Sequence, residues 1–188
     1  MRALVGILLC TALFAAAADQ PPPFKIERVG GAAPLTLAGY RGKVVMLALI
    51  STTCPHCQKL TGDLIPVAKE YGPRGVQFLG CAFNDDAQNL VAAFIMQFQP
   101  AFPVGWATRD AVYTLLGRSV LDQRPLYVPH LLFLDRAGKV QADVAGESDF
   151  MNNAIDNIRG ELDRLLGAVS ASKTAKSAGK NSTARSPR

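Results

Sequence analysis

Two cysteines separated by two residues, Cys54 and Cys57, form a CPHC segment, the minimum requirement for reversible dithiol chemistry. The apolar run at 43–50 in front of them predicts a buried strand, and the stretch at 58–71 carries apolar residues at helical spacing. This pattern places Cys54 at the start of a helix, where unpaired backbone N–H groups and the helix dipole favour a thiolate. A thiolate is the nucleophile that attacks disulfides, so the sequence predicts a reactive Cys54.

The two intervening residues, Pro55 and His56, complete the candidate catalytic motif. We expect Cys54 to attack a disulfide and Cys57 to resolve the mixed disulfide that forms. The imidazole of His56 follows the reactive sulfur closely and lowers the electrostatic cost of its negative charge. The alternative is that His56 is an exposed spacer with little effect.

The rest of the chain alternates strand and helix patterns. Helices interleaved with strands predict parallel pairing, and a hairpin with glycine at its turn adds an antiparallel pair. We therefore expect one α/β domain with a mixed central sheet flanked by helices. The predicted strands are 24–29, 35–37, 43–50, 76–83, 104–107, 131–134 and 140–144, and the predicted helices are 58–71, 87–97, 109–116 and 148–166, with Ser148 as the last N-cap.

The first 18 residues have the pattern of a signal peptide. Arg2 is followed by an apolar stretch at 4–14 and by small residues ending at Ala18, after which we expect cleavage. The exported protein would then be periplasmic or extracellular and soluble, with a linker and short strand at 19–29. Cys10 fits a leader hydrophobe; a lipid-anchored cysteine is the alternative, but Leu9 stands where a small residue is required.

The sequence predicts a folded domain at 30–168 and a disordered basic tail at 169–188. The tail is rich in Ser, Ala, Lys and Thr, and its five basic residues account for the whole net charge of +5. The remaining charges balance, so they indicate no partner for the folded domain, and export argues against a nucleic-acid partner for the tail. The tail alone is suited to acidic surfaces such as lipid headgroups.

Three segments resemble the thioredoxin superfamily, and most closely its exported TlpA-like branch, which also resembles the alkyl hydroperoxide reductase (AhpC/TSA) group. The first is the lead-in at 35–45, the second is CPHC at 54–57, and the third is YVPHLLFLD at 127–135 with Gly138-Lys139-Val140. The resemblance implies a thioredoxin-like fold in which the Cys54 helix packs across the sheet. It also implies a cis peptide bond before Pro129, opposite the dithiol.

The resemblance further implies a thiol–disulfide oxidoreductase that exchanges disulfides with protein substrates. Cys54 and Cys57 would form its redox-active disulfide, and Val128 and Pro129 would contact the substrate peptide. We expect a monomer without organic cofactor or metal, which exchanges electrons with other proteins, a membrane redox partner among them. Relatives with Pro-His between the cysteines lean toward oxidation. Here Ala48 replaces the buried acid that assists proton transfer in thioredoxins.

A thiol peroxidase is the first alternative, because the fold is shared. Peroxide-reacting cysteines have a Ser or Thr three residues before them and a proline four residues further back. Ser51 fits the first position, whereas Leu47 occupies the second. An arginine beside the thiolate is also required, and Arg109 and Arg124 are the candidates.

Metal sites are weaker alternatives. A copper relay would use Cys54, Cys57 and His130, and structural zinc would have to draw on Cys81, His56 and His130, which form no second spaced pair. A c-type haem would need histidine directly after the second cysteine. Cys81 itself is expected to be a buried small hydrophobe, with a regulatory thiol as the alternative.

Overall fold

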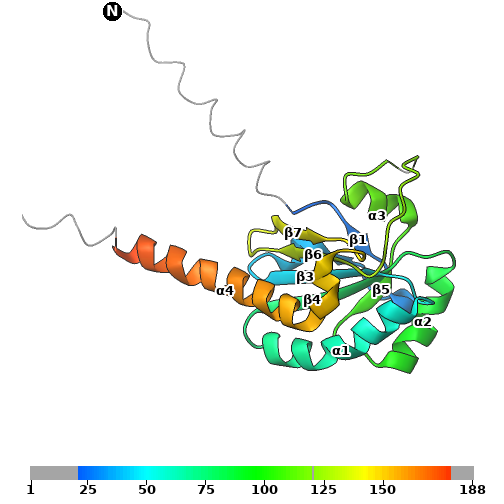
Figure 1. Ribbon diagram of the computed structural model, residues 1–188, viewed down its shortest axis with the longest axis horizontal. Coiled ribbons are helices and arrows are strands. Elements are labelled where there is room, and N and C mark those ends of the chain that lie inside the picture. Colours follow the sequence, from blue (N-terminus) through cyan, green and yellow to red (C-terminus); the bar gives the residue numbers. More distant parts are fainter. Residues whose placement is uncertain (1–20, 120, 179–188) are drawn as a thin grey trace, which may run out of the picture.

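A mixed five-stranded sheet in the order β5-β4-β3-β6-β7 forms the centre of the computed structural model, which describes residues 21–119 and 121–178 (Figure 1). Neighbouring strands β3, β4 and β5 run parallel, whereas β6 is antiparallel to β3 and β7 is antiparallel to β6. The predicted mixed sheet is therefore confirmed. The strands are β3 (Val44–Ile50), β4 (Val76–Ala82), β5 (Val104–Trp106), β6 (His130–Leu134) and β7 (Val140–Val144).

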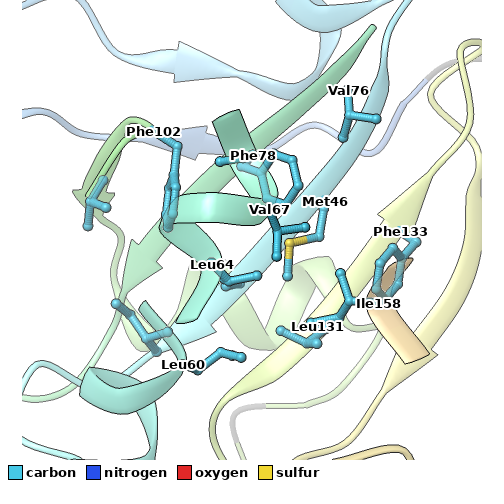
Figure 2. Packing of buried hydrophobic residues seen from close by; sticks show 14 of the residues in the cluster. Met46, Leu60, Leu64, Val67, Val76, Phe78, Phe102, Leu131, Phe133 and Ile158 are labelled. Carbon is cyan, nitrogen blue, oxygen red and sulfur yellow. The ribbon is translucent and has the colours of Figure 1, made fainter. Parts of the chain in front are cut away.

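The central strand β3 is buried on both faces, as its continuous apolar sequence predicts. Successive side chains point to opposite faces of a strand, so Met46 and Ala48 join one core layer while Leu47 and Leu49 join the other. Figure 2 shows the first layer, in which Met46 and Phe133 of the sheet lie near Val67 and Ile158 of the covering helices.

Helices cover both faces of the sheet. The first layer lies under α1 (Pro55–Tyr71), α2 (Ala87–Phe98) and α4 (Ala154–Ala178), and the second lies under α3 (Arg109–Leu115) and the N-terminal segment (Figure 1). Because α1 follows β3 directly, its first turn starts at the C-terminal end of this central strand. The CPHC segment therefore lies at that end of the sheet.

A short N-terminal hairpin, β1 (Lys25–Ile26) with β2 (Leu35–Thr36), closes the far side of β5. Glu27 and Trp106 exchange two backbone hydrogen bonds of 2.8 and 2.9 Å. Gly105 permits this approach, because a Cβ there would overlap the Glu27 carbonyl oxygen. Short 3₁₀ turns lie between β1 and β2 (η1, Val29–Gly31), after β2 (η2, Leu37–Tyr40) and before α4 (η3, Asp149–Asn153).

The last helix differs from its prediction at both ends. Ser148 occupies the N-cap position of η3 rather than of α4, without a side-chain capping bond, because its hydroxyl donates to the Ala145 carbonyl at 2.7 Å. The 3₁₀ turn η3 comes between Ser148 and α4, which begins at Ala154. At the other end α4 continues to Ala178, past the predicted end near Leu166 and into the segment predicted to be disordered. Alanine and lysine in this stretch are strong helix formers, which accounts for the extension.

The predicted signal peptide at 1–18, which includes Cys10, and the last ten residues of the predicted tail, 179–188, lie outside the described residues. Within the described ranges, no helix is both long enough and apolar enough to cross a membrane.

Candidate dithiol site

A tight turn at 51–54 connects β3 to α1 and sets the position of the first cysteine. The Cys54 amide donates to the Ser51 carbonyl at 3.3 Å. The buried Thr52 donates from its amide to the Asn84 side-chain oxygen at 2.9 Å, and Gln58 donates to the Thr52 carbonyl at 2.9 Å. The end of β4 and the second turn of α1 therefore both fix this turn.

Cys54 occupies the N-cap position of α1, as predicted, with Pro55 at the first helical position. Its thiol is free and partly buried, and its side chain makes no capping hydrogen bond. The first turn of α1 contains no acidic residue, so no carboxylate of that turn competes for the unpaired N–H groups. This end of the helix can therefore stabilise negative charge on a sulfur.

Cys57 lies one turn further and is fully buried in the first core layer. Its sulfur accepts a hydrogen bond from the Ser51 amide at 3.4 Å. Burial raises the pKa of the Cys57 thiol to about 12, and the Ser51 hydrogen bond opposes this only in part. Thr61 donates to the Cys57 carbonyl at 2.8 Å and is itself buried. One sulfur is thus accessible, and the other is kept as a thiol.

The Val128–Pro129 peptide bond is cis, which confirms the prediction for Pro129. The Val128 carbonyl oxygen lies 4.0 Å from the Cys54 sulfur. Gly146 backs this segment closely, because a Cβ there would lie 2.9 Å from the Tyr127 carbonyl oxygen and 3.0 Å from that of Pro129. The structure thus brings together Cys54, Cys57 and Val128-Pro129, as the sequence predicted.

A groove of about 730 Å³ is lined by His56 of the CPHC segment and is bounded by α1, the Val128-Pro129 segment and the β7–α4 connection. His56 is exposed on the α1 side, and Tyr127 is 50% exposed on the opposite side. Sequence reasoning did not find the 146–156 wall, because its residues carry no pattern that connects them to the cysteines. The volume of the groove falls within the roughly 300–1,000 Å³ typical of ligand-binding clefts.

Other residues considered from the sequence do not converge on the cysteines. His130 alternates with Leu131 along β6, so its side chain faces away from the layer that holds Cys57. Among the described residues, no group of three or more His, Cys, Asp or Glu side chains is placed to hold a metal ion. Cys81 is fully buried in the second layer, and burial raises the pKa of its thiol.

The two candidate arginines of a peroxidase site have acidic partners elsewhere. Arg109 pairs with Asp85 at 3.5 Å, and Arg124 pairs with Asp122 at 2.6 Å. Hydrogen bonds from Arg124 hold the pKa of the Asp122 carboxyl below its usual range. Sequence reasoning also missed Asn84, although its place directly after a predicted strand, beside two aspartates, was a usable signal.

Iodoacetamide at pH 8 should label Cys54 alone among the described cysteines of the folded, reduced protein. Cys57 is buried, and with a pKa of about 12 its thiolate fraction at pH 8 is on the order of one in ten thousand. Cys81 is buried as well. Mass spectrometry of tryptic peptides measures the pattern, and the same reaction in urea, where all thiols label, is the control. Comparable labelling of Cys54 and Cys57 in the folded protein would contradict this assignment.

The chain is similar to known redox proteins. The model of the AhpC/TSA family matches residues 17–143, and a comparison with curated proteins found no match. A thiol:disulfide interchange protein of the thioredoxin family from Chlorobium tepidum TLS superposes with a TM-score of 0.61 at 24% identity, over 78% of this chain and 96% of that one. The thioredoxin domain of a thiol-disulfide oxidoreductase from Bacteroides vulgatus gives 0.56 at 18% identity, over 74% and 94%.

The MTB protein DsbF gives a TM-score of 0.56 at 22% identity, over 78% of this chain and 94% of its own. These likenesses establish the thioredoxin fold, and the family match covers well over half of the chain. Together with the CPHC segment at the start of α1, they confirm the predicted resemblance. The chain belongs to the AhpC/TSA family and is a thioredoxin-like oxidoreductase.

Proposed function

We propose that this protein is an exported thiol–disulfide oxidoreductase that exchanges disulfides with protein substrates through Cys54 and Cys57. The observation that carries the proposal is the asymmetry of the two sulfurs. Cys54 is partly exposed at a helix N-terminus, whereas Cys57 is fully buried one turn away. A nucleophile must reach its target, and a resolving thiol must only reach the nucleophile, so each sulfur has the environment that its role requires.

In the reducing direction, the Cys54 thiolate attacks one sulfur of a target disulfide. A bond forms between Cys54 and the target, and the other target sulfur leaves as a thiolate. The Cys57 sulfur, once deprotonated, then attacks Cys54, which releases the second target thiolate and closes the Cys54–Cys57 disulfide. Two electrons pass from the dithiol to the target. The Cys57 proton goes to one target thiolate, and the other target thiolate takes a proton from solvent. The oxidising direction is the reverse.

Proton removal from Cys57 is the demanding step, because burial raises the pKa of this thiol to about 12. Ala48 stands in β3 where a buried acid would otherwise accept the proton, and it packs in the same core layer as Cys57. We therefore assign the proton to the target thiolate released in the first step, which is a base formed next to the mixed disulfide.

The Val128-Pro129 segment is the proposed peptide contact, with Pro55 and His56 completing the rim. Its carbonyl next to Cys54 and the adjoining groove support this role. The partners are therefore protein thiols and disulfides, and a membrane redox protein that restores the dithiol or the disulfide. The protein acts as a monomer, and its basic tail is suited to anionic lipid surfaces.

Serine substitutions should separate the roles of the three cysteines. We expect Cys54→Ser to abolish exchange with a disulfide-bonded peptide, because no nucleophile remains. Cys57→Ser should accumulate a mixed disulfide with the peptide, visible by mass spectrometry under non-reducing conditions. Cys81→Ser should exchange at about the wild-type rate and is the matched control.

The same variants test a thiol peroxidase, which the AhpC/TSA match makes the second candidate. The protein is a peroxidase instead if the wild type consumes peroxide but does not exchange disulfides, and if Cys54→Ser consumes no peroxide. Leu47 in place of the proline and the acidic partners of Arg109 and Arg124 favour disulfide exchange.

His56 should raise the reduction potential of the dithiol. It follows Cys54 closely and is exposed at the groove, so its N–H groups stabilise charge on the reduced sulfur. We expect His56→Pro to lower the potential by about 30 mV, a tenfold change in the equilibrium constant, measured against a glutathione buffer. Lys59→Ala is the control, because Lys59 lies on the same rim and pairs with Asp63. An unchanged potential in His56→Pro would refute the role of His56.

Export is proposed from the leader at 1–18, and the chain should begin at Asp19 after processing. Expression with the leader intact, followed by fractionation and N-terminal mass analysis, measures this. An arginine in place of Ala18 should leave the leader attached, because signal peptidase requires a small residue there. Recovery of wild-type protein with Met1 or Arg2 at its N-terminus, in the cytosolic fraction, would show that there is no export.

A further inference from the structure

Three polar side chains are buried among the described residues, and two of them lie at the dithiol site. Thr52 bonds Asn84 in the turn before Cys54, and Thr61 donates to the Cys57 carbonyl. The third is His130, which follows Pro129 directly and plays no part in the exchange steps. Burying a polar group costs free energy unless it is well bonded, so its presence in a row of leucines requires an explanation.

His130 is bonded on one side only. Its Nε2 lies 2.6 Å from the Asp143 carboxylate, while its Nδ1 is buried without a hydrogen-bond partner. Because a carboxylate oxygen accepts, Nε2 carries the proton of this bond. The His130 side chain is 7% exposed, and that of Asp143 is 53% exposed. A leucine at this place would avoid the unpartnered nitrogen, so the hydrogen bond to Asp143 is the feature that histidine adds.

The bond lies where the backbone ladder ends. β7 is an edge strand that pairs only with β6, and the first pair of that ladder joins Leu131 to Val144. His130 therefore has a strand partner on the β3 side, Leu49, and none on the β7 side. Asp143 pairs with Leu132, so the contact from His130 is a diagonal one on the same face of the sheet. The side chains tie β6 to β7 beyond the last backbone pair.

This tie acts on the segment that faces the reactive sulfur. Val128 and Pro129 immediately precede His130, and the Val128 carbonyl oxygen is 4.0 Å from the Cys54 sulfur. Gly146, shortly after β7, contacts the same segment from behind. Movement of the start of β6 relative to β7 would displace the Val128 carbonyl, which would alter the surface that meets a bound peptide.

We propose that His130 and Asp143 are positioning residues that hold the Val128-Pro129 segment in register for the substrate peptide. The inference rests on the proposed disulfide exchange. It assigns the pair no role in the chemistry of Cys54, because a small alkylating reagent can react with this sulfur without binding to the Val128-Pro129 segment. It also assigns the pair little role in overall stability, because His130 leaves a buried nitrogen unpartnered.

Three variants test the pair in the full-length protein. Asp143→Ala and His130→Leu remove the bond, while Asp143→Asn keeps an oxygen that accepts from Nε2. We expect the first two to raise KM for a disulfide-bonded peptide about fivefold, and Asp143→Asn to stay within about twofold of wild type. The rate of Cys54 alkylation by iodoacetamide should be unchanged in all three, and the unfolding midpoint of His130→Leu should not fall. Asp110→Ala, an exposed carboxylate in the first turn of α3, is the matched control.

Amide hydrogen exchange of the 126–131 segment supplies a readout that needs no activity. It should be faster in Asp143→Ala than in the wild type and in Asp143→Asn. A wild-type KM together with wild-type amide exchange in Asp143→Ala and His130→Leu would overturn the inference. The inference would also be overturned if the Cys54 alkylation rate and the unfolding midpoint both fell in Asp143→Ala and His130→Leu, because the pair would then have a general structural role. Failure of wild-type protein to exchange disulfides would remove the proposed function, and the amide exchange alone would then decide whether the tie exists.

Discussion

The boundary between core and surface passes between the two sulfurs of the CPHC segment, and the rest of the site depends on this. A single turn of α1 separates Cys54 from Cys57, yet the first is accessible and the second is completely buried. The first turn of α1 must therefore hold a fixed position against the sheet, with Cys57 covered and Cys54 accessible. Three contacts fix this position: the Ser51 amide bond to the Cys57 sulfur, the bond between Thr52 and Asn84, and the Gln58 bond to the Thr52 carbonyl.

The sheet topology supplies these partners from distant parts of the sequence. β3 and β4 are parallel, so the turn at 51–54 and Asn84 both lie at the end of the sheet where these two strands finish. β6 is antiparallel to β3, so its first residue, and Pro129 before it, lie at the same end. Segments 32 and 74 residues apart are thus brought into contact by strand direction alone. A mixed sheet is what allows one strand end and one strand start to meet there.

The sequence predicted the features that depend on local pattern. A continuous apolar run located β3, helical periodicity located α1, and the resemblance implied the cis bond before Pro129. The contacts that depend on register were not predictable in the same way. The position of Asn84 after a predicted strand indicates a place at the end of the sheet, but nothing local to Asn84 or Asp143 identifies the residue that each one contacts. The start of α4 was misplaced for a related reason: Ser148 has the residue type of an N-cap, but a 3₁₀ turn intervenes. The side of the sheet that His130 faces was, however, readable from its alternation with the leucines of β6.

The composition of the core around the dithiol determines where the protons can go. Ala48 and the residues around Cys57 form an apolar layer. The buried polar side chains of the described region bond elsewhere: Thr61 to the Cys57 carbonyl, Thr52 to the Asn84 side chain and His130 to Asp143. A buried acid would lower the barrier to deprotonating Cys57 at a cost in folding free energy, since burying a charge is expensive. Alanine avoids that cost and leaves the thiol dependent on a base from outside. In the proposed exchange, a target thiolate appears only after Cys54 has reacted, so deprotonation of Cys57 would be coupled to the presence of a bound substrate. Burial of the second sulfur would then protect the dithiol between reactions as well as shape its chemistry.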